Sequence, residues 1–261
     1  TASCDIADLH LSIKAGTDTL LFNGLLAYLA LNQKLDCNYI ERHTENFEEA
    51  LDLAISQSAN TKALAESCNL ELNDLLSFFE LFAKTDKTLS FYSQGVNQSA
   101  SGTDKANAII NCHLATGRVG KVGASPFSIT GQPNAMGGRE VGGLANQLAA
   151  HMDFAKPADV DRVKRFWQAP NIAETAGLKA VDLFEGVESG KIKFLWVMST
   201  NPMVSMPDAD RFKRALKNCE MVVVSDCIEK TDTTAIADIL LPAATWGEKD
   251  GTVTNSERRI S

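Results

Sequence analysis

The chain has 261 residues, of which 44% are hydrophobic and 22% are charged, a composition typical of a globular protein with one large or two modest domains. Its formal net charge of −8 argues against nucleic acid and acidic membranes as partners, because both attract basic surfaces. No apolar run reaches the roughly 18–20 residues that are needed to cross a bilayer.

The cysteines and histidines predict no metal site in this chain. No two of the six cysteines form a CxxC pair, and the four histidines lack the spacing of metal ligands. Scattered cysteines in a chain of this length are typical of proteins from a reducing compartment. The chain begins without methionine, and we expect it to be an internal piece of a longer protein.

The first part of the sequence is mainly helical. Gly16 provides a turn, and Asp18 can cap the helix that follows, because its carboxylate accepts free amide hydrogens. Residues 19–33 are strongly apolar, which predicts a helix buried on most of its faces. Further helices are predicted over 45–84, where one stripe at helical spacing should enter the core: Leu72, Leu75, Leu76, Phe79 and Phe82.

A glycine-rich passage follows these helices. A short β-prone run within 88–99 precedes a helix over 103–117, after which glycines recur up to residue 143. The stretch GQPNAMGGREVGG, residues 131–143, holds five glycines and one proline, so we predict a loop here rather than the interior of a helix or strand. Bare backbone amides in such a loop form concavities that bind anions.

One arginine, Arg139, lies in this glycine-rich stretch. Its guanidinium can bind a small planar oxyanion through two parallel hydrogen bonds. In the alternative interpretation the loop only connects two domains, and Arg139 pairs with a neighbouring carboxylate such as Glu140 or Glu174. The residues by themselves leave both interpretations open.

The clearest predicted unit alternates strands and helices. Apolar runs at 192–198, 220–226 and 239–242 predict strands, separated by an amphipathic helix over 207–218 and a short helix over 232–238. This order implies a parallel sheet with right-handed crossovers, and unbroken apolar runs are typical of a sheet covered on both faces. The predicted fold class is α/β, with Rossmann-like parallel-sheet layers flanked by helices.

Polar residues follow each of these strands. Asn201 lies in a Ser-Thr-Asn-Pro turn after the first strand, Ser225 and Asp226 end the second, and Lys249 follows the third. Open parallel sheets bind ligands at the carboxyl ends of their strands, where a carboxylate can accept from hydroxyl or ring N–H donors. Neither a GxGxxG nor a P-loop motif is present. Asn201 and Asp226 are therefore open to two interpretations. They contact a nucleotide-like ligand, or they have only the ordinary roles of a turn residue and a helix cap.

Several longer motifs resemble those of the dimethyl sulfoxide reductase family of molybdopterin oxidoreductases. They are GVNQS, NAIINCHLATGRVGKVGASPFSITGQPNAMGGREVGGLAN, VMSTNP, VVVSD and ADILLPAATWGEKDGTVTNSERR. Within the family the pattern is most similar to the assimilatory nitrate reductases. The resemblance covers nearly the whole chain, and it implies parts of two adjoining α/β domains, residues 1–138 and 139–261, the first of which binds cofactor.

This resemblance implies a molybdenum centre held by two molybdopterin guanine dinucleotides, which reduces nitrate to nitrite by oxygen-atom transfer. Arg139 would line the substrate funnel, although its loop is one residue shorter than in periplasmic nitrate reductases. Those relatives also carry methionine where this chain has Gln94. The implied dinucleotide contacts are Gly16, Thr17, Asp18, Gln94, Gln98, Asn201, Ser225, Asp226 and Lys249.

The resemblance also implies what lies outside the chain. The cysteines of a [4Fe-4S] cluster and the cysteine that ligates molybdenum are expected upstream, so the fragment itself would hold no metal ligand and would be inactive alone. We interpret Cys112 and Cys227 as buried packing residues. The expected partners are nitrate and an electron-donor protein, in the cytoplasm. The alternatives are a formate dehydrogenase of the same fold and a non-catalytic scaffold subunit of an electron-transfer complex.

Overall fold

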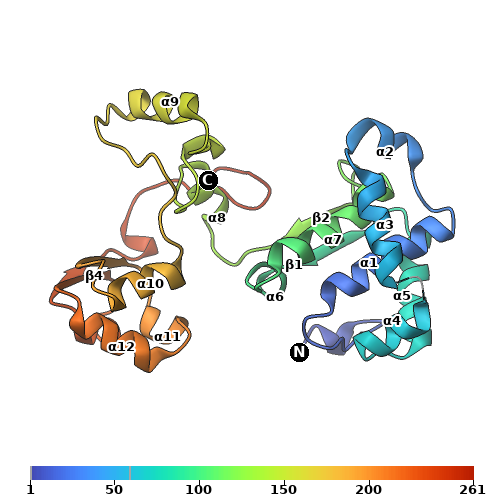
Figure 1. The fold of residues 1–261 in the computed structure, drawn as a ribbon, viewed down its shortest axis with the longest axis horizontal. Helices are drawn as coiled ribbons and strands as arrows, with labels where there is room; N and C mark the ends of the chain where they lie inside the picture. The colour runs from blue at the N-terminus through green and yellow to red at the C-terminus, as the bar shows by residue number, and fades with distance from the viewer. Residues whose placement is uncertain (1, 59) are drawn as a thin grey trace. The chain divides into compact units, whose positions relative to one another are not determined.

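The computed structural model describes residues 2–58 and 60–261, which form two compact units with a boundary between Gly131 and Gln132 (Figure 1). Each unit combines helices with a short parallel sheet, which confirms the predicted α/β class. No helix in the described part of the chain is long and apolar enough to cross a membrane.

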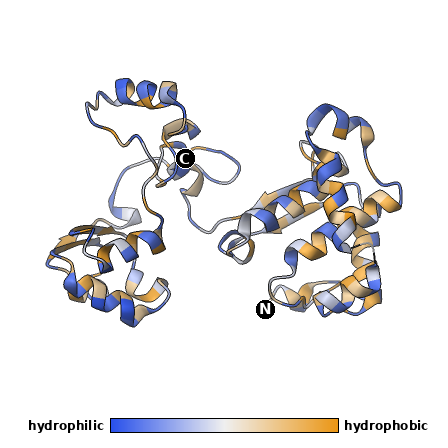
Figure 2. Cartoon of the chain, viewed as in Figure 1, coloured by the Kyte–Doolittle hydropathy of each residue, from blue (hydrophilic) through white to orange (hydrophobic). Residues whose placement is uncertain are grey.

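The first unit is built around helix α1 (Asp18–Leu31), which is apolar on most of its faces, as predicted (Figure 2). Its Leu25 and Leu29 are fully buried. The predicted core stripe is largely confirmed in α5 (Leu72–Lys84), where Leu75, Phe79 and Phe82 pack into the same core as α1. Leu72 is partly buried against that core, and Leu76 is half-buried outside it. Other helical segments of this unit are η1 (Cys4–Ile6), α2 (Cys37–His43), α3 (Phe47–Ser58), α4 (Thr61–Cys68) and α7 (Gly102–Ala115).

A two-stranded parallel sheet completes the first unit. Strand β1 (Leu89–Tyr92) pairs with β2 (Ser125–Ser128), with Leu89 opposite Ser125 and Tyr92 opposite Ser128. The short helix α6 (Gln94–Asn97) directly follows β1, and α7 forms most of the crossover to β2. The carboxyl ends of both strands therefore lie at the same edge of this sheet.

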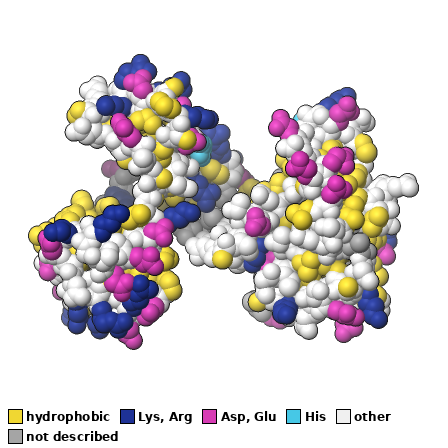
Figure 3. Space-filling model, in the orientation of Figure 1, with side chains coloured by type: hydrophobic (Ala, Val, Ile, Leu, Met, Phe, Trp, Pro, Cys, Tyr) yellow, Lys and Arg dark blue, Asp and Glu magenta, His cyan; other side chains and the backbone are white. Residues whose placement is uncertain are grey.

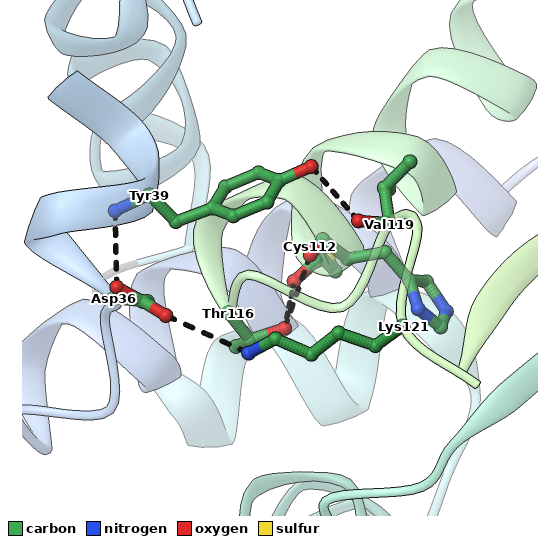
Figure 4. A network of polar contacts seen from close by, with 7 residues as sticks. Asp36, Tyr39, Cys112, Thr116, Val119 and Lys121 are labelled. Carbon is green, nitrogen blue, oxygen red and sulfur yellow. Dashed lines mark hydrogen bonds and ion pairs between the residues drawn. The ribbon is translucent and has the colours of Figure 1, made fainter. Parts of the chain in front are cut away.

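A polar network fastens α2 to the turn after α7 (Figure 4). Asp36 caps α2, because its Oδ1 accepts from the Tyr39 amide at 3.0 Å, and its Oδ2 lies 3.8 Å from the Lys121 ammonium. The Tyr39 hydroxyl donates to the Val119 carbonyl at 3.0 Å. These contacts hold the segment that leads into β2.

The second unit begins with a helix where the sequence predicts a loop. Helix α8 (Ala135–Glu140) occupies the middle of the glycine-rich stretch. It ends in a Schellman motif. The Gly143 amide donates to the Gly138 carbonyl at 2.7 Å, and the Gly142 amide donates to the Arg139 carbonyl at 3.1 Å. Gly142 adopts φ +81°, a conformation that favours glycine. The loop prediction was wrong because these glycines end and pack a helix rather than prevent one.

A three-stranded parallel sheet in the order β3-β4-β5 confirms the predicted β-α-β-α-β unit. Its strands are β3 (Phe194–Met198), β4 (Met221–Asp226) and β5 (Ile239–Pro242). The helical segments of this unit, besides α8, are η2 (Ala149–His151), α9 (Pro157–Trp167), α10 (Ala180–Glu188), α11 (Pro202–Ser205), α12 (Ala209–Asn218), η3 (Thr234–Ile236) and η4 (Trp246–Glu248).

Only one face of this sheet is covered in the part of the chain that the structure describes. Helices α10 and α12 pack Phe184, Phe212 and Leu216 against it. On the other face Trp196 and Met198 are 48% and 60% exposed, and hydrophobic side chains reach the surface there (Figure 3). Both helical crossovers fall on the same face, because the strands follow one another in chain order and such crossovers are right-handed. Coverage of the second face stays a prediction for the whole protein.

Candidate functional site

In the first unit, Gly16 and Thr17 form the turn before α1. Gly16 has φ +88°, and Thr17 donates its amide and its hydroxyl to the Lys14 carbonyl at 3.1 and 2.7 Å. Asp18 does not cap α1 as predicted, because it is the first helical residue and the flanking Thr17 makes no side-chain cap. Its carboxylate instead pairs with the Lys105 ammonium at 2.8 Å.

Lys105 is the partner that the sequence did not reveal. It belongs to α7, and only 6% of the residue is exposed. A buried ammonium requires an anionic partner to offset its lost hydration, so Asp18 is held in place by this pair. The same contact ties the Gly16–Asp18 turn to the first turns of α7.

Gln94 and Gln98 lie beside the beginning of α7 as well. Gln94 is the first residue of α6, and Gln98 is the C-cap residue directly after that helix. A side chain at Gly102, the first residue of α7, would collide with the carbonyl oxygens of residues 96 and 97, so the two helices pack closely. The two predicted groups of the first unit thus both lie next to the start of α7.

In the second unit, the sheet register brings two of the predicted strand ends together. Met198 pairs with Ser225, and Asp226 pairs with Pro242, so the turn that contains Asn201 begins beside the end of β4. This arrangement places the candidate groups at one edge of the sheet, where open parallel sheets bind ligands.

Each of these residues already makes local contacts. Asn201 Oδ1 accepts from the Thr233 hydroxyl at 2.6 Å, and Ser225 Oγ accepts from the Trp196 indole at 2.9 Å. Asp226 Oδ1 accepts from the Ile228 amide at 3.0 Å, a turn contact of the kind that the alternative interpretation expected. Among the described residues Asp226 Oδ2 makes no hydrogen bond, so one carboxylate oxygen stays available as an acceptor.

Lys249 belongs to a different part of the second unit. It lines a cavity of about 460 Å³ together with residues of the C-terminal segment and of the turn before α8. The lining residues are Asn134, Trp246, Lys249, Asp250, Gly251, Thr252, Val253 and Ser261. Asn201, Ser225 and Asp226 are not part of this lining, so the second unit does not bring all of its predicted residues into one cavity.

Arg139 is exposed on α8 and pairs with no carboxylate among the described residues. The alternative that it is neutralised by Glu140 is wrong, because Glu140 Oε1 accepts instead from Arg258 Nε at 2.7 Å. The Arg139 carbonyl accepts from the Gln147 amide group at 2.6 Å, which holds the backbone and leaves the guanidinium unengaged. An unpaired arginine is suited to binding an anion.

The two cysteines interpreted as packing residues differ. Cys112 is fully buried, and burial strongly raises the pKa of its thiol, which confirms that prediction. Cys227 is exposed, so the prediction was wrong for it: it lies in the turn directly after β4 rather than within the sheet. No cluster of histidine, cysteine or carboxylate side chains among the described residues could hold a metal ion.

Three contacts of the candidate residues could not be predicted, because the two partners of each contact lie far apart in the sequence. Lys105 pairs with Asp18, Thr233 with Asn201, and Arg258 with Glu140. Local periodicity carries no information about such pairs.

The family model described as molybdopterin oxidoreductase matches residues 1–261. A protein of Shewanella frigidimarina named nitrate reductase is 50% identical over the whole chain, which spans 28% of that relative. The assimilatory nitrate reductase catalytic subunit of Bacillus subtilis is 34% identical over the whole chain, which spans 36% of it.

A solved structure has a similar fold. Acetylene hydratase from Pelobacter acetylenicus superposes with a TM-score of 0.73 at 17% identity, covering 98% of this chain and 37% of that one. At this identity the likeness concerns the fold alone. The match of the family model over residues 1–261 shows the family: the chain belongs to the molybdopterin oxidoreductases.

Proposed function

We propose that this chain is part of a molybdenum-dependent nitrate reductase, in which it contributes contacts to a bis-molybdopterin guanine dinucleotide and an arginine that binds nitrate. Relatives named nitrate reductase match the whole chain at 34–50% identity. The observation in the structure that carries the proposal is the unpaired Arg139 on α8, whose neighbour Glu140 is engaged elsewhere.

The residues present fit the chemistry of the proposed cofactor. A guanine presents ring N–H and amino donors, and Asp226 keeps a free carboxylate oxygen at the edge of the sheet to accept them. Pyrophosphate groups are anionic, and Lys249 offers an exposed ammonium on the wall of its cavity. We propose that Gly16, Thr17, Asp18, Gln94, Gln98, Asn201 and Ser225 provide the remaining contacts.

Arg139 would act by positioning the substrate. Its planar guanidinium matches the trigonal oxygens of nitrate, and its positive charge attracts both the nitrate and the nitrite anion. The bound molybdenum–pterin group would supply the two-electron centre that accepts the oxygen atom. Arg139 would also stabilise negative charge on the oxygens that stay with nitrogen.

The proposal extends to the iron–sulfur cluster, the electron donor and the cellular compartment of the whole enzyme. The whole protein would carry a [4Fe-4S] cluster and the molybdenum-ligating cysteine outside this chain, and it would receive electrons from a separate donor protein. We propose that it works in the cytoplasm, in nitrate assimilation. The six cysteines are scattered through the sequence, which is typical of proteins from a reducing compartment.

Replacement of Arg139 in the full-length enzyme tests the proposal. We expect Arg139→Ala to lower kcat/KM for nitrate about 100-fold, because a charge-assisted substrate contact is lost, while molybdenum content stays normal. Arg139→Lys keeps the charge but not the two-pronged geometry, so its loss should be smaller. An equal loss of molybdenum and of activity would show that the residue is structural.

A further inference from the structure

The C-terminal residues 253–261 form a small hairpin in the second unit. Val253 and Ser261 exchange backbone hydrogen bonds at 3.0 and 2.9 Å, and Thr254 bridges Ile260 in antiparallel fashion. At the tip the Asn255 carbonyl accepts from the Arg258 amide at 2.9 Å. We call residues 253–261 the C-terminal hairpin.

One contact joins this hairpin to the beginning of α8. The Thr254 amide donates to Asn134 Oδ1 at 3.0 Å, across 120 positions of the sequence. Asn134 stands at the N-cap position of α8, where asparagine normally caps its own helix, but it makes no such bond. Its side chain is therefore used to hold the hairpin.

A second contact joins the hairpin to the end of α8. Arg258 Nε donates to Glu140 Oε1 at 2.7 Å, and the Glu140 side chain is only 23% exposed. Arg258 adopts φ +64°, a conformation that a residue with a side chain adopts at a cost. The hairpin thus contacts α8 at both ends, and Arg139 lies between the two contacts.

We propose that Asn134, Glu140 and Arg258 are positioning residues, which hold α8 so that Arg139 meets its anion in a fixed orientation. This inference rests on the proposed function. A helix of six residues has too few internal hydrogen bonds to fix its own orientation, so its attachments decide where Arg139 points. Because Asn134 and Ser261 also line the Lys249 cavity, the same contacts set the shape of that cavity.

The test measures nitrate kinetics of the full-length enzyme with a chemical electron donor. Arg258→Ala should raise KM for nitrate about tenfold and lower kcat by a smaller factor, because Arg139 loses its orientation, and it should leave molybdenum content within about twofold of the wild type. Arg258→Lys should restore most of the affinity, since it keeps a donor for Glu140. Arg259→Ala is the matched control, because among the described residues its side chain forms no ion pair, and it should leave KM unchanged.

A double replacement separates this inference from the proposed function. In an Arg139→Ala background, Arg258→Ala should cause no further rise in KM, because both changes act through the same guanidinium. If Arg139→Ala alone leaves nitrate kinetics unchanged, the proposed function fails. If Arg139→Ala impairs the enzyme but Arg258→Ala leaves KM unchanged, or if Arg259→Ala raises KM equally, the function stands and the positioning role is overturned.

Discussion

His113 is fully buried in the first unit and has a hydrogen bond at only one ring nitrogen. Its Nε2 lies 2.8 Å from the Ser90 hydroxyl, whereas Nδ1 has no partner among the described residues. The Arg118 guanidinium lies 4.3 Å above the ring of Phe82, which also contacts the His113 ring. Burial, and then the charge of Arg118, lower the pKa of His113 to about 4. The imidazole is therefore neutral at physiological pH.

The depressed pKa of His113 predicts how stability depends on pH. Between pH 6.5 and 4 the unfolded chain binds a proton at this residue and the folded chain does not, so the free energy of unfolding should fall as the pH is lowered through this range, by roughly 3 kcal/mol. Thermal unfolding of the chain at several pH values measures this. His113→Gln should reduce the slope, whereas His43→Gln, an exposed control, should not. Identical slopes in both variants would contradict the assignment.

At the scale of elements, the sequence predicts best what depends on local periodicity. The strands β3, β4 and β5, the amphipathic helix α12 and the core stripe of α5 follow from apolar spacing alone. Helix α8 was missed because its glycines suggest a loop, while the hydrogen bonds that end it become visible only in three dimensions. The cap assigned to Asp18 failed because Asp18 is itself the first residue of α1, and its carboxylate pairs with Lys105 of α7.

The glycines of α8 provide a prediction at this scale. A methyl group at Gly137 would overlap the Asn134 side-chain oxygen and lie 3.2 Å from Thr254 Oγ1, whereas one at Gly138 would meet nothing within 4 Å. We expect Gly137→Ala to displace Asn134, free the C-terminal hairpin and accelerate amide exchange of residues 253–261, measured by hydrogen-exchange mass spectrometry. Gly138→Ala should leave this exchange unchanged, because it only favours the helix. Equal exchange in the two variants would show that Asn134 does not hold the hairpin.

At the scale of the whole molecule, the α/β class and the family could be predicted from motifs that run through both units. The placement of the candidate site could be predicted only in part. The sheet edge carries Asn201, Ser225 and Asp226 as expected, because the carboxyl ends of parallel strands lie together. Lys249 lines a separate cavity, because the segment after β5 leaves the sheet and folds toward the turn before α8. Strand order cannot predict the course of such a segment.

Metal and pterin analysis of the purified full-length protein, combined with assays of nitrate and formate, decides whether the chain is part of a molybdenum-dependent nitrate reductase. We expect stoichiometric molybdenum with a guanine dinucleotide form of the pterin, and reduction of nitrate to nitrite by a chemical electron donor. Formate should not be oxidised. A protein that lacks molybdenum, or one that oxidises formate and leaves nitrate unchanged, would rule out the proposed function.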